Sequence, residues 1–257
     1  MKKISLFTFL FFAFAYTFGQ DYKIAKTSGR LEIHLGNVTV EPTSGNEIIF
    51  SSKDKDRDDD DRAKGLVAVS GLGLEDNTHL GINVTTKGDA VVVQQLQKTQ
   101  SPEIRIQVPK GVIVAYDYES QYGDDAEFKN LENELEINAQ YNKIVLENIT
   151  GPVTCKTIYS EIEATFSQNV KGPVSLISIY SDVDVTMPGS LKADISMKTS
   201  YGAMYTSPDF KIDQTGNTKE GSMVEVSPNK VVGKIGGGGM KLDLRSDYSK
   251  IYLRKAK

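Results

Sequence analysis

The chain has 257 residues and a formal net charge of −4, because 34 Asp and Glu residues outnumber 30 Lys and Arg residues. This acidic balance argues against a nucleic-acid-binding protein, which requires a basic face. Cys155 is the single cysteine, so an intramolecular disulfide is excluded. After the N-terminal segment, no apolar run reaches the roughly 20 residues of a membrane-spanning helix.

Residues 1–19 have the pattern of an export signal. Lys2 and Lys3 form a basic start, an apolar run follows as far as Phe14, and Gly19 is a small residue at the expected cleavage site. The apolar run is shorter than the roughly 20 residues that a transmembrane helix needs. We therefore expect an exported protein, located in the periplasm or at the cell surface.

Alternating apolar and polar residues predict β-strands in the first part of the remaining chain. Such segments occur at 31–40, 48–50, 80–84, 90–93 and 104–114, with glycine or proline at several corners between them. No stretch shows helical periodicity. The sequence therefore predicts an all-β fold.

A charged run, Lys53–Arg62, separates two of these segments and contains no apolar residue. It predicts a solvated acidic loop. Carboxylates are also the ligands that Ca²⁺ prefers, so the loop holds weak candidate ligands. They are Asp54, Asp56, Asp58 and Asp60. The EF-hand pattern fails, because Asp59 stands where that loop requires glycine.

One short phrase is repeated from residue 108 onward. Two copies, Gly151–Phe166 and Gly172–Met187, agree at Gly, Pro, Val, Ile, Tyr, Ser and Thr without a gap. Each repeat has apolar residues on alternate positions before and after a tyrosine, and a small residue two positions before it. The tyrosines recur about every 20 residues until the last interval, which is more than twice as long. They are Tyr122, Tyr141, Tyr159, Tyr180, Tyr201 and Tyr248.

A β pattern with this period predicts a parallel β-solenoid with one rung for each repeat of about 20 residues. An antiparallel meander or sandwich is the alternative. We expect residues 20–257 to form one domain, with less regular rungs in 20–107, including the acidic loop at 53–62, and tyrosine-ladder repeats in 108–257. The long interval before Tyr248 predicts one rung without its tyrosine. The repeat at Tyr122 is out of step by one residue, which predicts a bulge.

The sequence resembles a family of exported, adhesin-like domains of unknown function that is common in Bacteroidetes-type bacteria. The resemblance is carried by the Val108–Gly111 corner, the tyrosine ladder, the Gly-Pro-Val openings at Gly151 and Gly172, and the run Gly236–Arg254. It covers nearly all of the chain after the signal. It implies a right-handed single-stranded parallel β-helix and a role as an adhesin. It implies no catalytic or cofactor-binding residues.

The tyrosine ladder has two interpretations: rings packed along a corner of the fold, or a platform for sugar rings. The small residue two positions earlier favours packed rings, since it leaves room for one. Cys155 occupies the ladder position of Ile137 and Leu176, so we expect it in the core and not as a nucleophile. His34 and His79 are the only histidines, and no motif marks either as a site.

We expect a non-enzymatic interaction module of the cell envelope, without a cofactor, whose partner is an envelope or surface protein or a glycan. One alternative is a polysaccharide lyase or hydrolase, because several carboxylates share an outward face near the tyrosines. These are Glu161, Glu163, Asp182 and Asp184, with Lys143, Lys156 and Lys250 as basic neighbours. A periplasmic signalling accessory is a further alternative.

Overall fold

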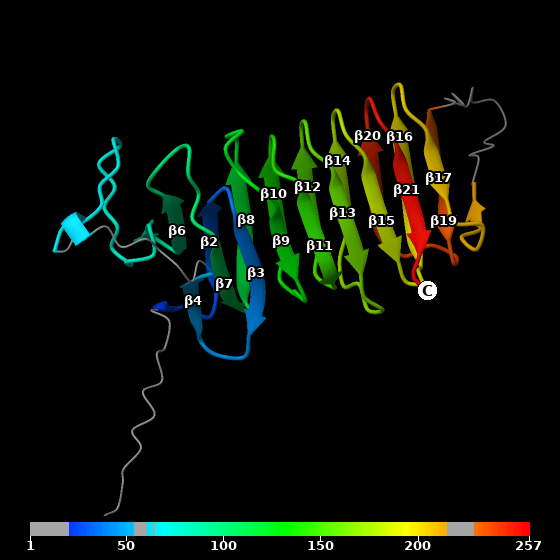
Figure 1. Cartoon of the computed structure of the whole chain (residues 1–257). Helices are drawn as coiled ribbons and strands as arrows, with labels where there is room; N and C mark the ends of the chain where they lie inside the picture. The colour runs from blue at the N-terminus through cyan, green and yellow to red at the C-terminus, as the bar shows by residue number, and fades with distance from the viewer. Residues whose placement is uncertain (1–20, 54–60, 64, 215–228) are drawn as a thin grey trace, which may run out of the picture.

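The computed structural model describes residues 21–53, 61–63, 65–214 and 229–257. In these residues the chain is all β, with one short 3-10 helix, η1 (Asp61–Ala63), and no α-helix. Two large sheets, here called sheet A and sheet B, consist mostly of parallel strands and enclose one hydrophobic core. The strands lie side by side along an elongated body (Figure 1).

The order of strands in each sheet defines the architecture. Sheet A contains β1 (Tyr22–Ala25), β4 (Glu47–Ser52), β7 (Ile104–Pro109), β3 (Val38–Thr43), β9 (Ala126–Lys129), β11 (Ile144–Ile149), β13 (Ile162–Phe166), β15 (Val183–Met187), β21 (Ile251–Lys255) and β17 (Met204–Thr206). Sheet B contains β18 (Ile212–Asp213), β19 (Lys230–Ile235), β16 (Ala193–Thr199), β20 (Met240–Ser246), β14 (Val174–Ser178), β12 (Val153–Thr157), β10 (Leu135–Ala139), β8 (Val112–Tyr118), β2 (Gly29–His34), β6 (Ala90–Gln95) and β5 (Ile82–Lys87).

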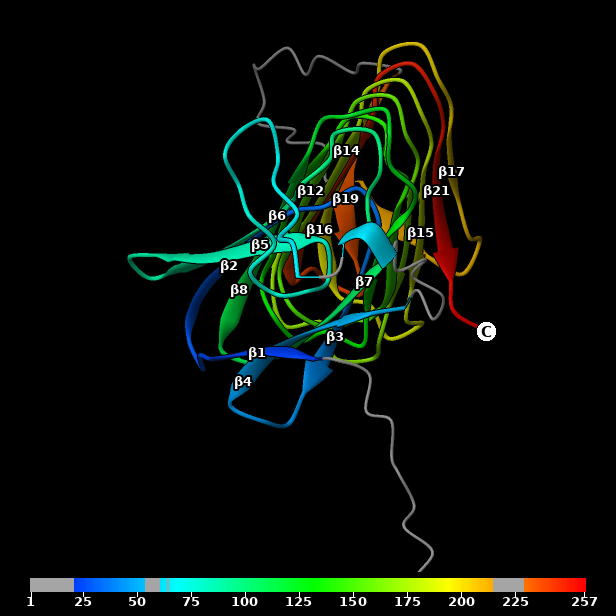
Figure 2. The same cartoon turned by 60° about the vertical axis from the view of Figure 1, so that its left-hand side comes forward.

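Each regular repeat contributes one strand to sheet B and, after a corner, one strand to sheet A (Figure 2). Neighbouring repeats pair in parallel and in register, so that Val153 lies between Leu135 and Val174 in sheet B. Ile162 lies in the same way between its equivalents in sheet A. The predicted ladders of equivalent residues are therefore present, and the antiparallel alternative is wrong for these repeats.

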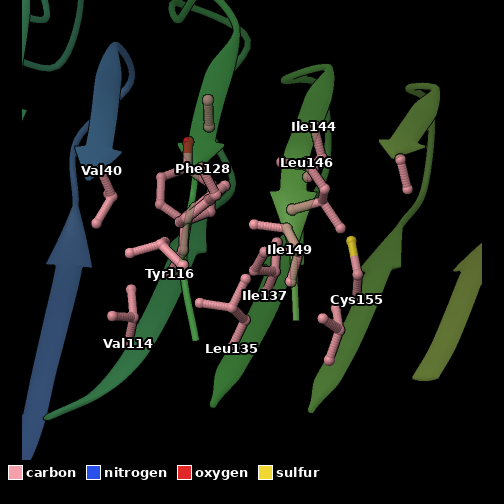
Figure 3. Packing of buried hydrophobic residues seen from close by; sticks show 14 of the residues in the cluster. Val40, Val114, Tyr116, Phe128, Leu135, Ile137, Ile144, Leu146, Ile149 and Cys155 are labelled. Carbon is pink, nitrogen blue, oxygen red and sulfur yellow. The ribbon is translucent and has the colours of Figure 1, made fainter. Parts of the chain in front are cut away.

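The core is made of the side chains at the predicted inward positions. Ile137, Cys155 and Leu176 follow one another across β10, β12 and β14, and they are 3%, 1% and 0% exposed. Figure 3 shows this row continuing into the aromatic pair Tyr116 and Phe128, whose rings meet edge to face at 5.8 Å. The expected core position of Cys155 is confirmed.

The repeat at Tyr122 differs from the later ones in the corner between β8 and β9, which spans residues 119–125 and is three residues longer than the corner at 140–143 between β10 and β11. Ala126 and Phe128 are both buried, and Ala126 pairs in register with Ile144. The strand itself is regular, so the predicted bulge is absent from β9 and the additional residues lie in the corner. Tyr122 is displaced from the position of the later tyrosines as a result.

The spatial order of the repeats departs from their order in the sequence at both ends of the chain. β20 lies between β14 and β16, and β21 lies between β15 and β17. Near the N-terminus, β2 and β3 are inserted in the same way between the pair β6 and β7 and the pair β8 and β9.

The rung without a tyrosine, expected between Tyr201 and Tyr248, is a wrong prediction for the described part of that interval. There the chain leaves β17, forms β18 and β19, and returns as β20. β19 pairs antiparallel to β16 and β18 antiparallel to β19, so neither continues the parallel repeats. The described part of the interval therefore adds two strands at this end of sheet B before the chain returns as the inserted repeat.

Gly202 tests the inserted position of the last repeat. A Cβ atom on Gly202 would overlap the carbonyl oxygen of Ser249, which belongs to that repeat. We expect Gly202→Ala to lower the free energy of unfolding by ~1–3 kcal/mol, the range for overpacking, as measured by urea denaturation. Gly71→Ala is the control, because no atom lies within 4 Å of a Cβ there. Equal stability of the two variants would contradict the inserted repeat.

Candidate functional site

Five tyrosines form one continuous stack along the corner between the sheets. The ring centroids are 5.1 Å apart for Tyr141 and Tyr159, 5.2 Å for Tyr159 and Tyr180, 4.9 Å for Tyr180 and Tyr248, and 5.0 Å for Tyr248 and Tyr201. Neighbouring ring planes differ by 19° at most. Tyr248 stands fourth in the stack because its repeat is inserted there.

The expected stacking of the rings along the corner is confirmed, but the rings lie on the surface, so the expectation that they are buried is wrong. Tyr180 is 51% exposed and Tyr201, the last ring of the stack, is 77% exposed. The tyrosine stands at the corner between sheet B and sheet A, where the alternation of inward and outward side chains is interrupted. Its side chain projects outward there. Tyr122 is also exposed but is not among the stacked rings of the described chain.

Where the small residue two positions before a tyrosine is Ser or Thr, its hydroxyl forms a hydrogen bond within the corner. Thr157 Oγ1 donates to the carbonyl oxygen of Ser160 at 2.6 Å, and Ser178 Oγ accepts from the backbone N–H of Ser181 at 3.1 Å. Both Thr157 and Ser178 are fully buried. They therefore satisfy the backbone of the turn and do not make room for a ring. The preference of Ser and Thr for bonding a nearby turn is the sequence signal for this role.

An outward row that contains basic side chains borders the stack on sheet B. The row consists of Lys156, Ile177, Arg245 and Lys198 in that order, and both lysines are exposed. Arg245 is held by Asp247, with Nε–Oδ1 and Nη2–Oδ2 distances of 2.8 Å. This row was not predicted, because Arg245 and Lys198 become neighbours only through the inserted repeat.

Three carboxylates of the predicted acidic patch, Glu161, Glu163 and Asp184, form ion pairs on the outer side of sheet A. Lys143 Nζ lies 2.6 Å from Glu163 and 3.8 Å from Glu161, and the hydrogen bond to Glu163 raises the pKa of Lys143. Asp184 forms a two-point pair with Arg254, with both N–O distances at 2.7 Å. Arg254 was missed by the sequence reasoning, since β21 lies next to β15 only after insertion.

The remaining members of the patch lie in different surroundings. Asp182 Oδ1 accepts the backbone N–H of Lys250 at 2.9 Å and the hydroxyl of Ser249. Lys156 is on β12 in sheet B, across the corner from the carboxylates. The structure therefore brings Glu161 and Glu163 together with Lys143, and does not bring Lys156 to them.

The other predicted candidates stay separate. His34 lies at the end of β2, and its Nδ1 donates to the carbonyl oxygen of Asp117 at 3.1 Å. His79 lies in the turn before β5. The calcium candidates at 54–60 are outside the described residues, so calcium binding stays a prediction.

Among the described residues, no three His, Cys, Asp or Glu side chains are grouped as metal ligands. That part of the chain also has no helix long and apolar enough to span a membrane.

Comparisons with known proteins give distant similarities only. No protein-family model and no curated protein matches the sequence. A solved structure of a candidate cell adhesion protein from Clostridium sporogenes ATCC 15579 has a TM-score of 0.46 and 10% identity, covering 93% of this chain and 100% of that chain. A candidate adhesin from Bacteroides fragilis NCTC 9343 has a TM-score of 0.31 and 8% identity, covering 92% and 96%. These similarities are too distant to transfer a function, and the family resemblance stays a prediction.

The stack predicts a modest contribution of each ring to stability. Tyr180→Ala removes two ring contacts but no buried side chain, so we expect a loss of ~1 kcal/mol in the free energy of unfolding, as for stacked aromatic pairs. Tyr122→Ala is the control, because that ring is exposed and unstacked, and we expect a change below ~0.5 kcal/mol. Equal losses in urea denaturation would mean that stacking contributes nothing.

The thiol of Cys155 should be inert in the folded protein. Burial raises the pKa of this thiol, because the interior disfavours the thiolate that reacts. We expect no reaction with a thiol reagent such as dithionitrobenzoate under native conditions, and full labelling above the unfolding transition. Immediate labelling of the native protein would show that the core at β12 is open.

Proposed function

We propose that this chain is a non-enzymatic, exported interaction module of the cell envelope, of adhesin-like character. We further propose that it folds as a right-handed single-stranded parallel β-helix. The repeats that alternate between two sheets of mostly parallel strands support this fold. The signal pattern of residues 1–19 supports export to the periplasm or the cell surface. This role requires no cofactor.

The exposed tyrosine stack is the observation that carries this function. Each inner ring has both faces covered by neighbours about 5 Å away, so its exposed part is the ring edge and the hydroxyl. In the described chain no protein group hydrogen-bonds the five stacked hydroxyls. Tyrosine combines apolar contact area with a polar group, and it is enriched in the energetically important parts of interfaces. A straight row of such groups is suited to binding.

The spacing of the row favours a ligand that is itself periodic. The hydroxyls follow the strand spacing of about 4.8 Å. An extended glycan advances by a similar distance per sugar and offers hydroxyl and ring oxygens as hydrogen-bonding partners. Lys156 and Lys198, beside the row, supply positive charge for acidic sugars. We therefore propose an extended, acidic envelope glycan as the ligand, bound along the ring edges and not stacked on the ring faces.

A binding assay with matched hydroxyl deletions tests this function. Isothermal titration with alginate and cello-oligosaccharides compares an acidic and a neutral extended glycan, and we expect tighter binding of the acidic one. Combined Tyr159→Phe and Tyr180→Phe keep the stack but remove two hydroxyls, so we expect affinity to fall about tenfold. Tyr122→Phe is the control and should bind as the unchanged protein does. No binding of either glycan, or full affinity of the double variant, would contradict the proposal.

The same assay separates the enzyme alternative, which rests on the carboxylates of sheet A. Shortened sugars would accumulate during incubation if the chain cleaved the glycan. Glu163→Gln should then abolish their release while binding persists. Under the proposed function, chromatography shows the glycan unchanged.

A further inference from the structure

The two sheets end differently at the C-terminal end of the molecule. Sheet B continues beyond β16 with the antiparallel strands β19 and β18, whereas sheet A ends at β17 (Figure 1). At the other end, antiparallel strands extend both sheets, β4 and β1 in sheet A and β5 in sheet B. Ile212 of β18 and Val231 of β19 are partly buried against the core. Sheet A has no described strand beyond β17 to face these two residues across the core.

β17 has one free hydrogen-bonding edge. The carbonyl oxygen of Ala203 accepts from the N–H of Ile251 at 2.9 Å, and the N–H of Ser207 donates to Leu253 at 2.8 Å. Residues in a parallel ladder face alternate neighbours, so the backbone groups of Met204 and Thr206 face away from β21. In the described chain, no strand pairs with them on that side.

The side chains of β17 are also exposed on the side away from β21. Thr206 is exposed, although its ladder partner Leu253 is only 1% exposed. Tyr205 stacks on Tyr252 of β21 at 5.3 Å and is 51% exposed. Because β17 is the last strand of sheet A, the other face of the Tyr205 ring has no neighbour in that sheet. An aromatic side chain on an added strand would find this face open.

A pocket of about 460 Å³ lies beside the free edge. Its apolar lining includes Met197, Met204, Phe210, Ile212 and Val231. These residues come from both sheets and from the turn after β17. The pocket is therefore placed to receive the inward apolar side chains of a strand that pairs with β17.

We propose that the free edge of β17 is a docking site for an extended strand of a partner protein with an apolar–aromatic–apolar pattern. The apolar side chains enter the pocket and the aromatic ring covers Tyr205. Main-chain hydrogen bonds supply affinity and alternate side-chain sites supply specificity, as in other strand additions. The chain already makes this interface on the opposite side of β17, where Ile251, Tyr252 and Leu253 of β21 have this pattern. The partner strand continues it.

A peptide copied from β21 tests the site. Fluorescence anisotropy follows binding of labelled Ser-Lys-Ile-Tyr-Leu-Arg-Lys to the full chain, with a scrambled peptide as reference. Thr206→Pro removes an N–H that faces the free edge and keeps the bonds to β21, so we expect about tenfold weaker binding. Thr206→Val keeps this N–H and should bind within about twofold of the unchanged chain. Tyr205→Ala, which leaves the backbone unchanged, should also weaken binding. Melting temperatures check that each variant is folded.

Several results would overturn the proposal. Failure of the peptide to bind, or equal affinity of Thr206→Pro and Thr206→Val, would remove the site. Binding that appears only after deletion of residues 215–228 would make the chain itself the occupant. A dimer in sedimentation velocity that Thr206→Pro dissociates would make a second copy the occupant. Saturable binding to the unchanged monomer, lost in Thr206→Pro, supports the partner strand.

Discussion

In-register backbone pairing between parallel strands is the constraint on which the rest of this structure depends. A buried strand must satisfy its N–H and C=O groups on both sides, and parallel pairing does so with neighbours about 4.8 Å apart. Equivalent residues are thereby stacked, so each position of the repeat becomes a row. The inward rows form the core, the Ser and Thr row closes the corners, and the tyrosine row has centroid distances of 4.9 to 5.2 Å.

Parallel pairing also leaves unsatisfied edges, and the two ends of the molecule deal with them in different ways. The first and last repeats are inserted between others, so their strands have neighbours on both sides. At three of the four sheet ends, segments outside the repeat pair antiparallel and form the edge, namely β4 with β1, β5, and β19 with β18. Very short edge strands such as β18 limit pairing with other chains. At the fourth end the described chain adds no such segment, so the edge of sheet A is β17, a strand of the repeat itself.

The sequence predicted the positions within a repeat better than the order of the repeats. Cys155 was placed in the core because alternation alone determines which side chains point inward. The insertion of the last repeat was not predictable, because Val174 can pair in the same register with Ile195 or with Leu242, and the structure chooses Leu242. The pairing of Arg254 with Asp184 depends on that choice. The exposure of the tyrosines depends on the backbone path at the corner, which alternation does not specify.

The two proposed surfaces differ in how they relate to the repeat. The tyrosine row lies along the side, so its length depends on the number of repeats, and a long ligand gains contacts without any change in geometry. Stacking fixes each ring against its neighbours, so less side-chain freedom is lost on binding. The edge of β17 occurs once, at the point where the repeat stops. A periodic ligand along the side and a single strand at the end would therefore bind without competing, because they contact different parts of the repeat formed by β16 and β17, the corner at Tyr201 and the edge of β17.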